Sequence, residues 1–164
     1  MRAKLSLMIL SLLLKFTDRT REKMSHMADV HNKKTRSYNM SRIRSKNTKP
    51  EIVVRKYLFS KGFRFRIHAK YLPGHPDLVL AKYKTVIFVN GCFWHGHEGC
   101  FFSKIPSTRN EWWQKKIEYT KERDISVYHQ LLTKGWKVLL VWECELKKDA
   151  VIRMEKLINE IRIE

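Results

Sequence analysis

The pattern of hydrophobic and polar positions predicts helices that alternate with short strands after residue 47. A first helix follows Thr48, which can cap it, and Glu51 three residues later completes a capping box. Gly62 ends this helix. Apolar residues next occur at the spacing of strands, first alternating with arginine and then in continuous runs that are typical of buried strands. The predicted strands are residues 63–67, 77–80, 85–89 and 136–142.

Two more helices are predicted, one on either side of the last strand. Apolar positions at helical spacing begin at Asn110 or Glu111 and continue to about Lys134, and Gly135 ends that helix. Asp149 is a suitable cap for a terminal helix, whose single apolar stripe we expect to pack in the core. The order of helix, three strands, helix, strand and helix predicts an α/β domain with a mixed central sheet flanked by helices.

The N-terminal part of the chain has a different character. An apolar run over residues 5–14 follows two basic residues, which is the outline of a signal peptide, but the run is too short to span a membrane and no small-residue cleavage site follows it. Since the later sequence predicts a complete domain, we expect residues 1–26 to be an extension outside the fold. Residues 27–47 predict a basic arm with a short helix near residues 38–43, and such an arm either follows a DNA groove or is a solvated tail.

Basic residues outnumber acidic residues along the chain. The 34 lysines and arginines against 16 aspartates and glutamates give a formal net charge of +18 and a pI near 10.0. This charge predicts a polyanionic partner, because lysine and arginine release counterions from a phosphate backbone. Together with the aromatic content it favours nucleic acid over the alternatives, a ribosome-like or a membrane-surface protein. The hydrophobic share of 43% is that of a folded domain.

Two carboxylates are candidates for a cation site. Asp77 begins a buried strand, where a carboxylate packs poorly but can hold a hard cation at the edge of a sheet. Magnesium held by one or two carboxylates and a substrate phosphate fits phosphodiester hydrolysis. A turn aspartate bonded to its own loop is an equally good interpretation of Asp77. Glu51 is better explained by its helix cap, although the start of a helix can also aim a carboxylate at a neighbouring strand.

Cysteine and histidine are concentrated in the loop of residues 91–100. The chain has three cysteines, an odd number that does not suggest a disulfide framework and that suits a reducing cytoplasm. Cys92, His97 and Cys100 can supply three metal ligands and Cys144 a fourth, which is a set suited to structural zinc. Buried free thiols beside a solvent-facing histidine are the alternative, because the spacing is not that of a zinc finger.

Three other residues of this loop have properties that serve catalysis or DNA binding. His95 is left outside the zinc set, and an imidazole can take or give a proton at physiological pH. Phe93 and Trp94 lie next to it in the sequence, without a periodicity that would bury both. Their rings can wedge between bases or stack on them, and core packing is the alternative, above all for Trp94.

Four blocks of this sequence resemble the Vsr family of very-short-patch repair endonucleases. The blocks are SRIRSKNTKPE (residues 41–51), PGHPD (73–77), VIFVNGCFWHGH (86–97) and the segment from GW to VWEC (135–144). The family nicks double-stranded DNA beside a T:G mismatch, which arises when 5-methylcytosine deaminates, and its fold is a variant of the PD-(D/E)xK restriction-endonuclease fold. The resemblance therefore implies a magnesium-dependent DNA endonuclease, with its zinc-containing domain over residues 48–164.

The resemblance also implies roles for single residues. Magnesium would be bound by Asp77 and by the backbone carbonyl of Val89. His95 would be the general base or acid, and Asp124 would support it. Glu51 would be a second catalytic acid that acts through metal-bound water. The structural zinc would be held by the four loop and strand-end residues named above, Cys92, His97, Cys100 and Cys144.

DNA contacts are implied for a second group of residues. Phe93, Trp94 and Met40 would form a wedge that opens the mismatch from opposite grooves. Further contacts are expected from Arg42, Arg44, Lys46 and Asn90. Asn90 departs from the family, where many relatives have histidine, although an asparagine can still hydrogen-bond a phosphate. The second acid and the lysine of the PD-(D/E)xK motif are also absent after Asp77.

From these features we expect a cytoplasmic monomer, without membrane association, that binds double-stranded DNA with a T:G mismatch. The resemblance also implies a functional link to a cytosine-5 DNA methyltransferase and contacts with mismatch-repair proteins. Two other hypotheses stay open. One is a DNA-binding module with structural zinc that does not cut, which has no use for Asp77 beside His95. The other is a nuclease of the same fold with another target, such as less specific DNA or RNA.

Overall fold

A computed structural model describes residues 32–163, so the predicted extension over residues 1–26 and the first residues of the predicted arm lie outside the described residues. The described chain divides into two compact units. The larger unit contains residues 44–104 and 111–163, and the smaller unit contains residues 32–43 and 105–110. Within this part of the chain, no helix combines the length and the apolar character needed to cross a membrane.

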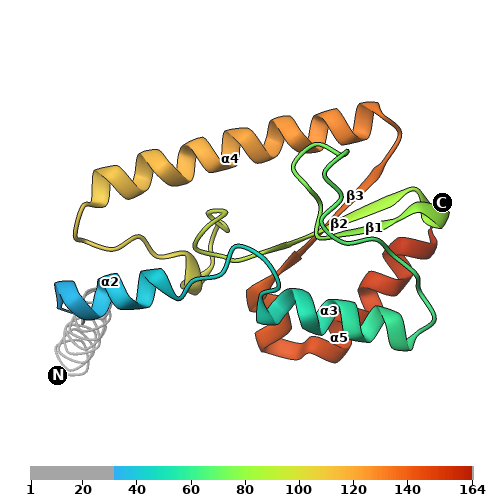
Figure 1. Cartoon of the computed structure of the whole chain (residues 1–164), viewed down its shortest axis with the longest axis horizontal. Coiled ribbons are helices and arrows are strands. Elements are labelled where there is room, and N and C mark those ends of the chain that lie inside the picture. Colours follow the sequence, from blue (N-terminus) through green and yellow to red (C-terminus); the bar gives the residue numbers. More distant parts are fainter. Residues whose placement is uncertain (1–31, 164) are drawn as a thin grey trace, which may run out of the picture. The chain divides into compact units, whose positions relative to one another are not determined.

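A three-stranded sheet is the centre of the larger unit (Figure 1). Its strands are β1 (Leu78–Leu80), β2 (Thr85–Asn90) and β3 (Lys137–Trp142), in the order β1-β2-β3. β1 pairs antiparallel with β2 after the short helix η2 (Ala81–Tyr83). β3 pairs parallel with β2, because the long helix α4 (Asn110–Thr133) returns the chain to the starting end of the sheet. The predicted mixed sheet is confirmed.

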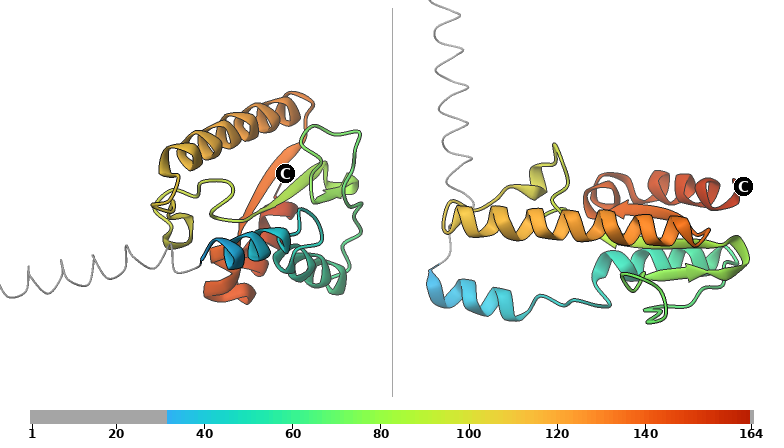
Figure 2. Two further views of the ribbon diagram at one scale, coloured as in Figure 1. Left: turned by 60° about the vertical axis from the view of Figure 1, so that its left-hand side comes forward. Right: turned by 90° about the horizontal axis from the view of Figure 1, so that it is seen from above.

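Helices cover both faces of this sheet, as Figures 1 and 2 show. The helices α3 (Lys49–Ser60) and α5 (Glu143–Arg162) pack on one face, where Ile87 is fully buried in a core with their side chains. On the other face Val86 packs in a second core with Leu131 of α4. Full burial of each such side chain contributes about 1.5–3 kcal/mol. The predicted α/β domain with helices around a mixed sheet is therefore confirmed.

The helix boundaries follow the local signals in the sequence. Thr48 caps α3, and the side chain of Glu51 completes the predicted capping box. Gly135 follows α4 with a φ of 72°, a backbone conformation that favours glycine. Asp149 interrupts α5 with a φ of −158° and accepts a hydrogen bond from the backbone N–H of Ile152 at 3.0 Å. The predicted cap is thus present, but a first helical turn precedes it directly after β3.

The strand predicted over residues 63–67 is wrong. Within this segment only Arg66 pairs with the sheet, through an isolated antiparallel bridge to Val79. The predicted alternation of burial is partly present, since Phe63 is buried and Arg64 exposed. The segment does not extend into a strand because its partner, β1, is only three residues long and sits at the edge of the sheet.

The smaller unit contains the helix α2 (Lys33–Ser41). The short helix predicted near residues 38–43 therefore exists but starts earlier. Its start is set by Asn32, whose side-chain oxygen accepts a hydrogen bond from the backbone N–H of Thr35 at 2.9 Å. In the larger unit, a short 3₁₀ helix, η3 (Phe101–Ser103), lies in the loop between β2 and α4.

Candidate active site and metal centre

Asp77 lies directly before β1 and is held against β2. Its Oδ2 accepts a hydrogen bond from the backbone N–H of Val89 at 2.8 Å. Burial raises the pKa of Asp77 to about 6, although the Val89 hydrogen bond acts in the opposite direction, and the nearby Glu51 raises the pKa further. A half-buried carboxylate with a raised pKa next to a second carboxylate is poorly compensated by the protein alone. This arrangement favours a bound cation.

Glu51 combines a structural role with a position beside Asp77. Its side chain is only 3% exposed. Oε1 accepts hydrogen bonds from the N–H and hydroxyl of Thr48, which is the capping role. Oε2 accepts from the N–H of Asn47 and forms an ion pair with Nη2 of Arg55 at 2.6 Å. The helix cap therefore fixes a carboxylate at the place where α3 meets the strand that follows Asp77.

His68 joins these two carboxylates, and no pattern in the sequence indicated it. Single ligand atoms of Glu51, His68 and Asp77 all lie within 4.8 Å of one another. His68 has a φ of 50°, a conformation that is uncommon for a residue other than glycine. Burial lowers the pKa of His68, and the positive charge of Arg55 lowers it further, which favours the neutral imidazole. The three side chains together have the composition of a divalent metal site.

Arg55 is a second residue of this site that the sequence interpretation missed. It contacts Glu51, the Asn47 side-chain oxygen at 2.6 Å and Nε2 of His68 at 3.4 Å. No described atom accepts a hydrogen bond from its buried Nε. The sequence did contain one signal, because Arg55 follows Glu51 by four residues and such pairs are neighbours on a helix. The guanidinium places a positive charge beside the two carboxylates.

His95 lies in the loop after β2 and is paired with a residue of α4. Its Nδ1 is 2.5 Å from Oδ2 of Asp124, whose other oxygen accepts hydrogen bonds from Arg123. Burial alone would raise the pKa of Asp124, but the hydrogen bonds from His95 and Arg123 outweigh it, so the pKa lies below its usual value. His95 is also close enough to Asp77 for its charge to oppose the effect of burial on the pKa of that carboxyl. The acid site and the histidine therefore face a common region.

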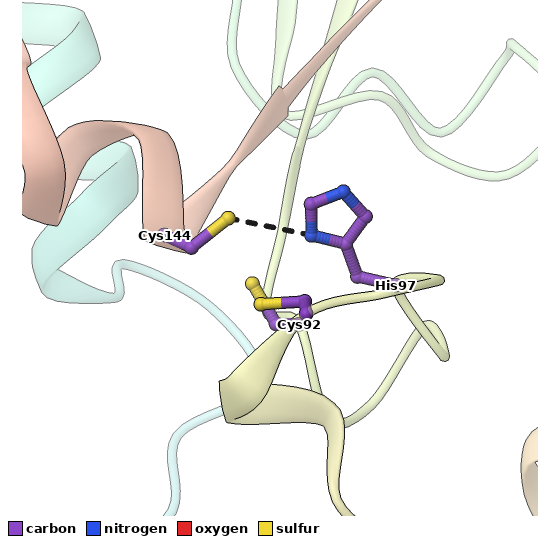
Figure 3. Close-up of side chains that lie close together, drawn as sticks. Cys92, His97 and Cys144 are labelled. Carbon is purple, nitrogen blue, oxygen red and sulfur yellow. Dashed lines mark hydrogen bonds between the residues drawn. The ribbon is translucent and has the colours of Figure 1, made fainter. Parts of the chain in front are cut away.

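The four residues predicted to bind zinc are brought together. Ligand atoms of Cys92, His97, Cys100 and Cys144 lie within 4.8 Å of one another. Nδ1 of His97 is 3.3 Å from the sulfur of Cys144, and Cys92 points to the same place (Figure 3). The His97 ring stacks on Trp142 with 4.0 Å between centroids. Cys92 is buried and Cys144 follows β3, so this cluster links the loop to the sheet.

Phe93 and Trp94 belong to a partly exposed aromatic cluster rather than to either core. Their rings are 5.0 Å apart and meet edge to face. Trp113, near the start of α4, lies 5.0 Å from Phe93 and 6.0 Å from Trp94 and contacts Trp112. Trp112 is 51% exposed. The other three rings are half-buried, so the cluster is partly accessible to solvent. Trp113 is a member that the sequence patterns did not indicate.

The remaining residues expected to contact DNA lie in different environments. Met40 and Arg42 belong to the smaller unit and are exposed. Arg44 and Lys46, at the start of the larger unit, are exposed as well. Asn90 is only 3% exposed, and its side-chain amide donates a hydrogen bond to the hydroxyl of Tyr128 at 3.1 Å. Asn90 is therefore positioned through α4, and its side chain is largely shielded from solvent.

Comparisons with known proteins identify the family of this chain. The family model of the DNA mismatch endonuclease Vsr matches residues 28–101. The chain is 47% identical over 138 residues to the type II nicking enzyme V.NmeAIP of Neisseria meningitidis serogroup A, with 83% of this chain and 98% of that enzyme covered. It is 44% identical over 138 residues to the DNA mismatch endonuclease Vsr of Escherichia coli K12, with 84% and 85% covered. The chain therefore belongs to the Vsr family of DNA mismatch endonucleases and is a DNA endonuclease.

Proposed function

We propose that this endonuclease nicks one strand of duplex DNA beside a T:G mismatch by magnesium-dependent hydrolysis of a phosphodiester bond. The observation that supports the proposal best is that Asp77 lies beside Glu51 and within electrostatic range of His95. A non-cutting DNA-binding module would not need a raised-pKa carboxylate next to a histidine that is itself held by an acid.

Magnesium is the cation that this proposal places at the carboxylates. Asp77 would be its main ligand, and the backbone carbonyl of Val89, whose N–H is bonded to Asp77, would be a second one. Glu51 lies close to Asp77. The donor set fits, because magnesium takes one or two carboxylates and leaves positions for water and substrate phosphate. When bound, the ion supplies charge neutralisation for the phosphate and a lowered pKa for water. The protein itself holds the oxygens of Glu51 at the start of α3 and those of Asp77 directly before β1.

His95 handles the proton in the proposed reaction. Asp124 accepts a hydrogen bond at Nδ1 of His95, so Nε2 is the nitrogen that faces the reaction. As general base, Nε2 takes a proton from the attacking water while the water oxygen bonds to phosphorus and the ester oxygen leaves with the bonding electrons. The same pairing stabilises the protonated imidazole that results.

The Cys92, His97, Cys100 and Cys144 cluster is proposed as a structural zinc site. Four sulfur and nitrogen donors without a further open position are the set that structural zinc prefers. Its place between the loop and the end of β3 gives it a role in positioning, because His95 and the aromatic cluster belong to the same loop. Phe93 and Trp94 are proposed to enter the mismatch, with Met40 in the opposite groove and Arg42, Arg44 and Lys46 on phosphates.

Nicking assays on oligonucleotide duplexes that differ only at one base pair test this function. We expect a single strand break in a duplex with one T:G mismatch and magnesium, and none in the same duplex with T:A or C:G at that position. Asp77→Asn should abolish the break, and Glu155→Gln on the exposed side of α5 is the control that should cut normally. Equal cutting of mismatched and paired duplexes would overturn the mismatch specificity. Binding without any magnesium-dependent break would support the non-cutting module instead.

A further inference from the structure

We infer that His68 is a further protein ligand of the divalent metal at the Glu51 and Asp77 carboxylates. The inference rests on the proposed function, since it concerns the same cation. It adds one imidazole nitrogen to a set of carboxylate oxygens, and it changes which metals the site prefers.

The distances within the cluster suit a shared cation. Ligand atoms of Glu51, His68 and Asp77 lie within 4.8 Å of one another. Two ligands on opposite sides of a magnesium-sized ion are about 4.2 Å apart, because each bond is about 2.1 Å long. Movements of a few tenths of an ångström in three side chains are enough to close the difference. His68 can therefore reach the cation without rearrangement of the backbone.

Nε2, the nitrogen of His68 to which we assign the coordination, has only weak partners among residues 32–163. Nε2 lies 3.3 Å from Oδ1 of Asn47 and 3.4 Å from Nη2 of Arg55, and both distances are long for hydrogen bonds. Both atoms have shorter hydrogen bonds elsewhere. Nη2 of Arg55 donates to Oε2 of Glu51 at 2.6 Å, and Oδ1 of Asn47 accepts from Nη1 of Arg55 at 2.6 Å. A metal can take the lone pair of Nε2 without breaking a strong hydrogen bond.

The backbone holds His68 at this place at some cost in strain. Its φ of 50° is unfavourable for a residue with a side chain. The conformation is fixed from both sides, because Arg66 and Val79 exchange backbone hydrogen bonds of 3.0 and 2.8 Å and Ala69 is buried at 6% exposure. The turn thus directs the imidazole at the carboxylates rather than at solvent.

A nitrogen ligand alters metal selectivity. Carboxylate and water ligands suit magnesium, whereas imidazole favours transition metals. Manganese accepts the same octahedral oxygen environment and also binds nitrogen, so the mixed set is expected to bind Mn²⁺ more tightly than Mg²⁺. Of the histidines in the larger unit, only His68 should affect this preference for Mn²⁺ over Mg²⁺.

Pulsed electron paramagnetic resonance on the full chain tests the inference without DNA and without turnover. The cysteine site is first filled with Zn²⁺, and one equivalent of Mn²⁺ is then added. We expect ¹⁴N modulation from one imidazole in the wild type and its loss in His68→Gln, together with a Mn²⁺ affinity at least about tenfold weaker. The affinity for Mg²⁺ should fall less. His129→Gln, on the exposed side of α4, is the matched control that keeps the modulation.

Each result decides the question. Absence of ¹⁴N modulation in the wild type, or its persistence in His68→Gln, would overturn the inference, and His68→Asn replaces the glutamine variant if that variant does not fold. His95→Gln identifies the nitrogen if the signal comes from the other nearby histidine, which would also overturn it. If only the inference fails, the wild type still nicks T:G duplexes but shows no ¹⁴N modulation from His68. If the proposed function fails, the wild type makes no magnesium-dependent break that is specific for the T:G duplex.

Discussion

Nδ1 of His95 and Oδ2 of Asp124 lie 2.5 Å apart, although 29 residues separate them in the chain. The contact joins the loop after β2 to the long helix α4. Asp124 is only 14% exposed and is also paired with Arg123, so its carboxylate is fixed and ionised. Because a carboxylate at Nδ1 sets the tautomer, the contact leaves Nε2 as the nitrogen of His95 that can exchange a proton.

Asp124→Asn should therefore slow nicking without weakening DNA binding. An amide can orient the imidazole but can stabilise the wrong tautomer, and it does not stabilise the protonated form. We expect single-turnover nicking to be roughly a hundredfold slower or more, with an unchanged affinity for a T:G duplex in fluorescence anisotropy. Glu122→Gln, an exposed carboxylate on the same helix, serves as the control. Wild-type nicking rates in Asp124→Asn would remove Asp124 from the proton-transfer proposal.

Metal binding should depend on pH through Asp77. Burial raises the pKa of this carboxyl to about 6 in the metal-free protein. The cation binds the ionised form, so protons and metal compete below pH 6, and the competition ends above it. We expect the Mg²⁺ affinity measured by calorimetry to rise by up to about tenfold for each pH unit between pH 4.5 and 6, and to level off above pH 7. A flat profile through pH 6 would contradict the assignment of Asp77 as the main ligand.

Arg55→Gln should tighten metal binding. The guanidinium is 2.6 Å from Glu51 and within range of Asp77, and its charge opposes that of an incoming cation. Removing one like charge at this distance is expected to strengthen Mn²⁺ binding by roughly three- to tenfold at pH 8 and low salt, where the Asp77 carboxyl is ionised. Arg64→Gln, exposed on the following segment, tests whether a loss of net charge alone has the same effect. Weaker binding in Arg55→Gln would mean that Arg55 is needed to hold Glu51 in place.

The sequence was informative where a structure depends on neighbours in the chain. The cap at Thr48 and Glu51, the buried run of β2 and the glycine after α4 are short-range features, and all are present. It was less informative where pairing is long-range. Residues 63–67 alternate correctly but find only one partner position, since the length of β1 is not encoded in that segment.

Parts of the candidate site were missed for the same reason. His68 reaches Glu51 and Asp77 through a turn with positive φ that no glycine, asparagine or aspartate marks. Trp113 meets Phe93 only because α4 begins beside the loop that contains the cysteines. The candidate zinc ligands could be predicted from the sequence, because cysteines and histidines clustered in one loop of a basic chain are typical of a metal site.

Removal of zinc should loosen the loop before it affects the rest of the chain. Cys92, His97 and Cys100 come from the loop and Cys144 from the start of α5, so the cluster joins two segments that are far apart in the sequence. Cys144→Ser, or treatment with a strong chelator, should release about one equivalent of zinc and lower the melting temperature by roughly 10 °C. Lys148→Ser on the same helix is the control that should keep both metal and melting temperature. The nicking rate should fall together with the zinc content, because His95 belongs to the same loop, and zinc-free protein that melts and nicks like the wild type would show that this cluster is not a structural metal site.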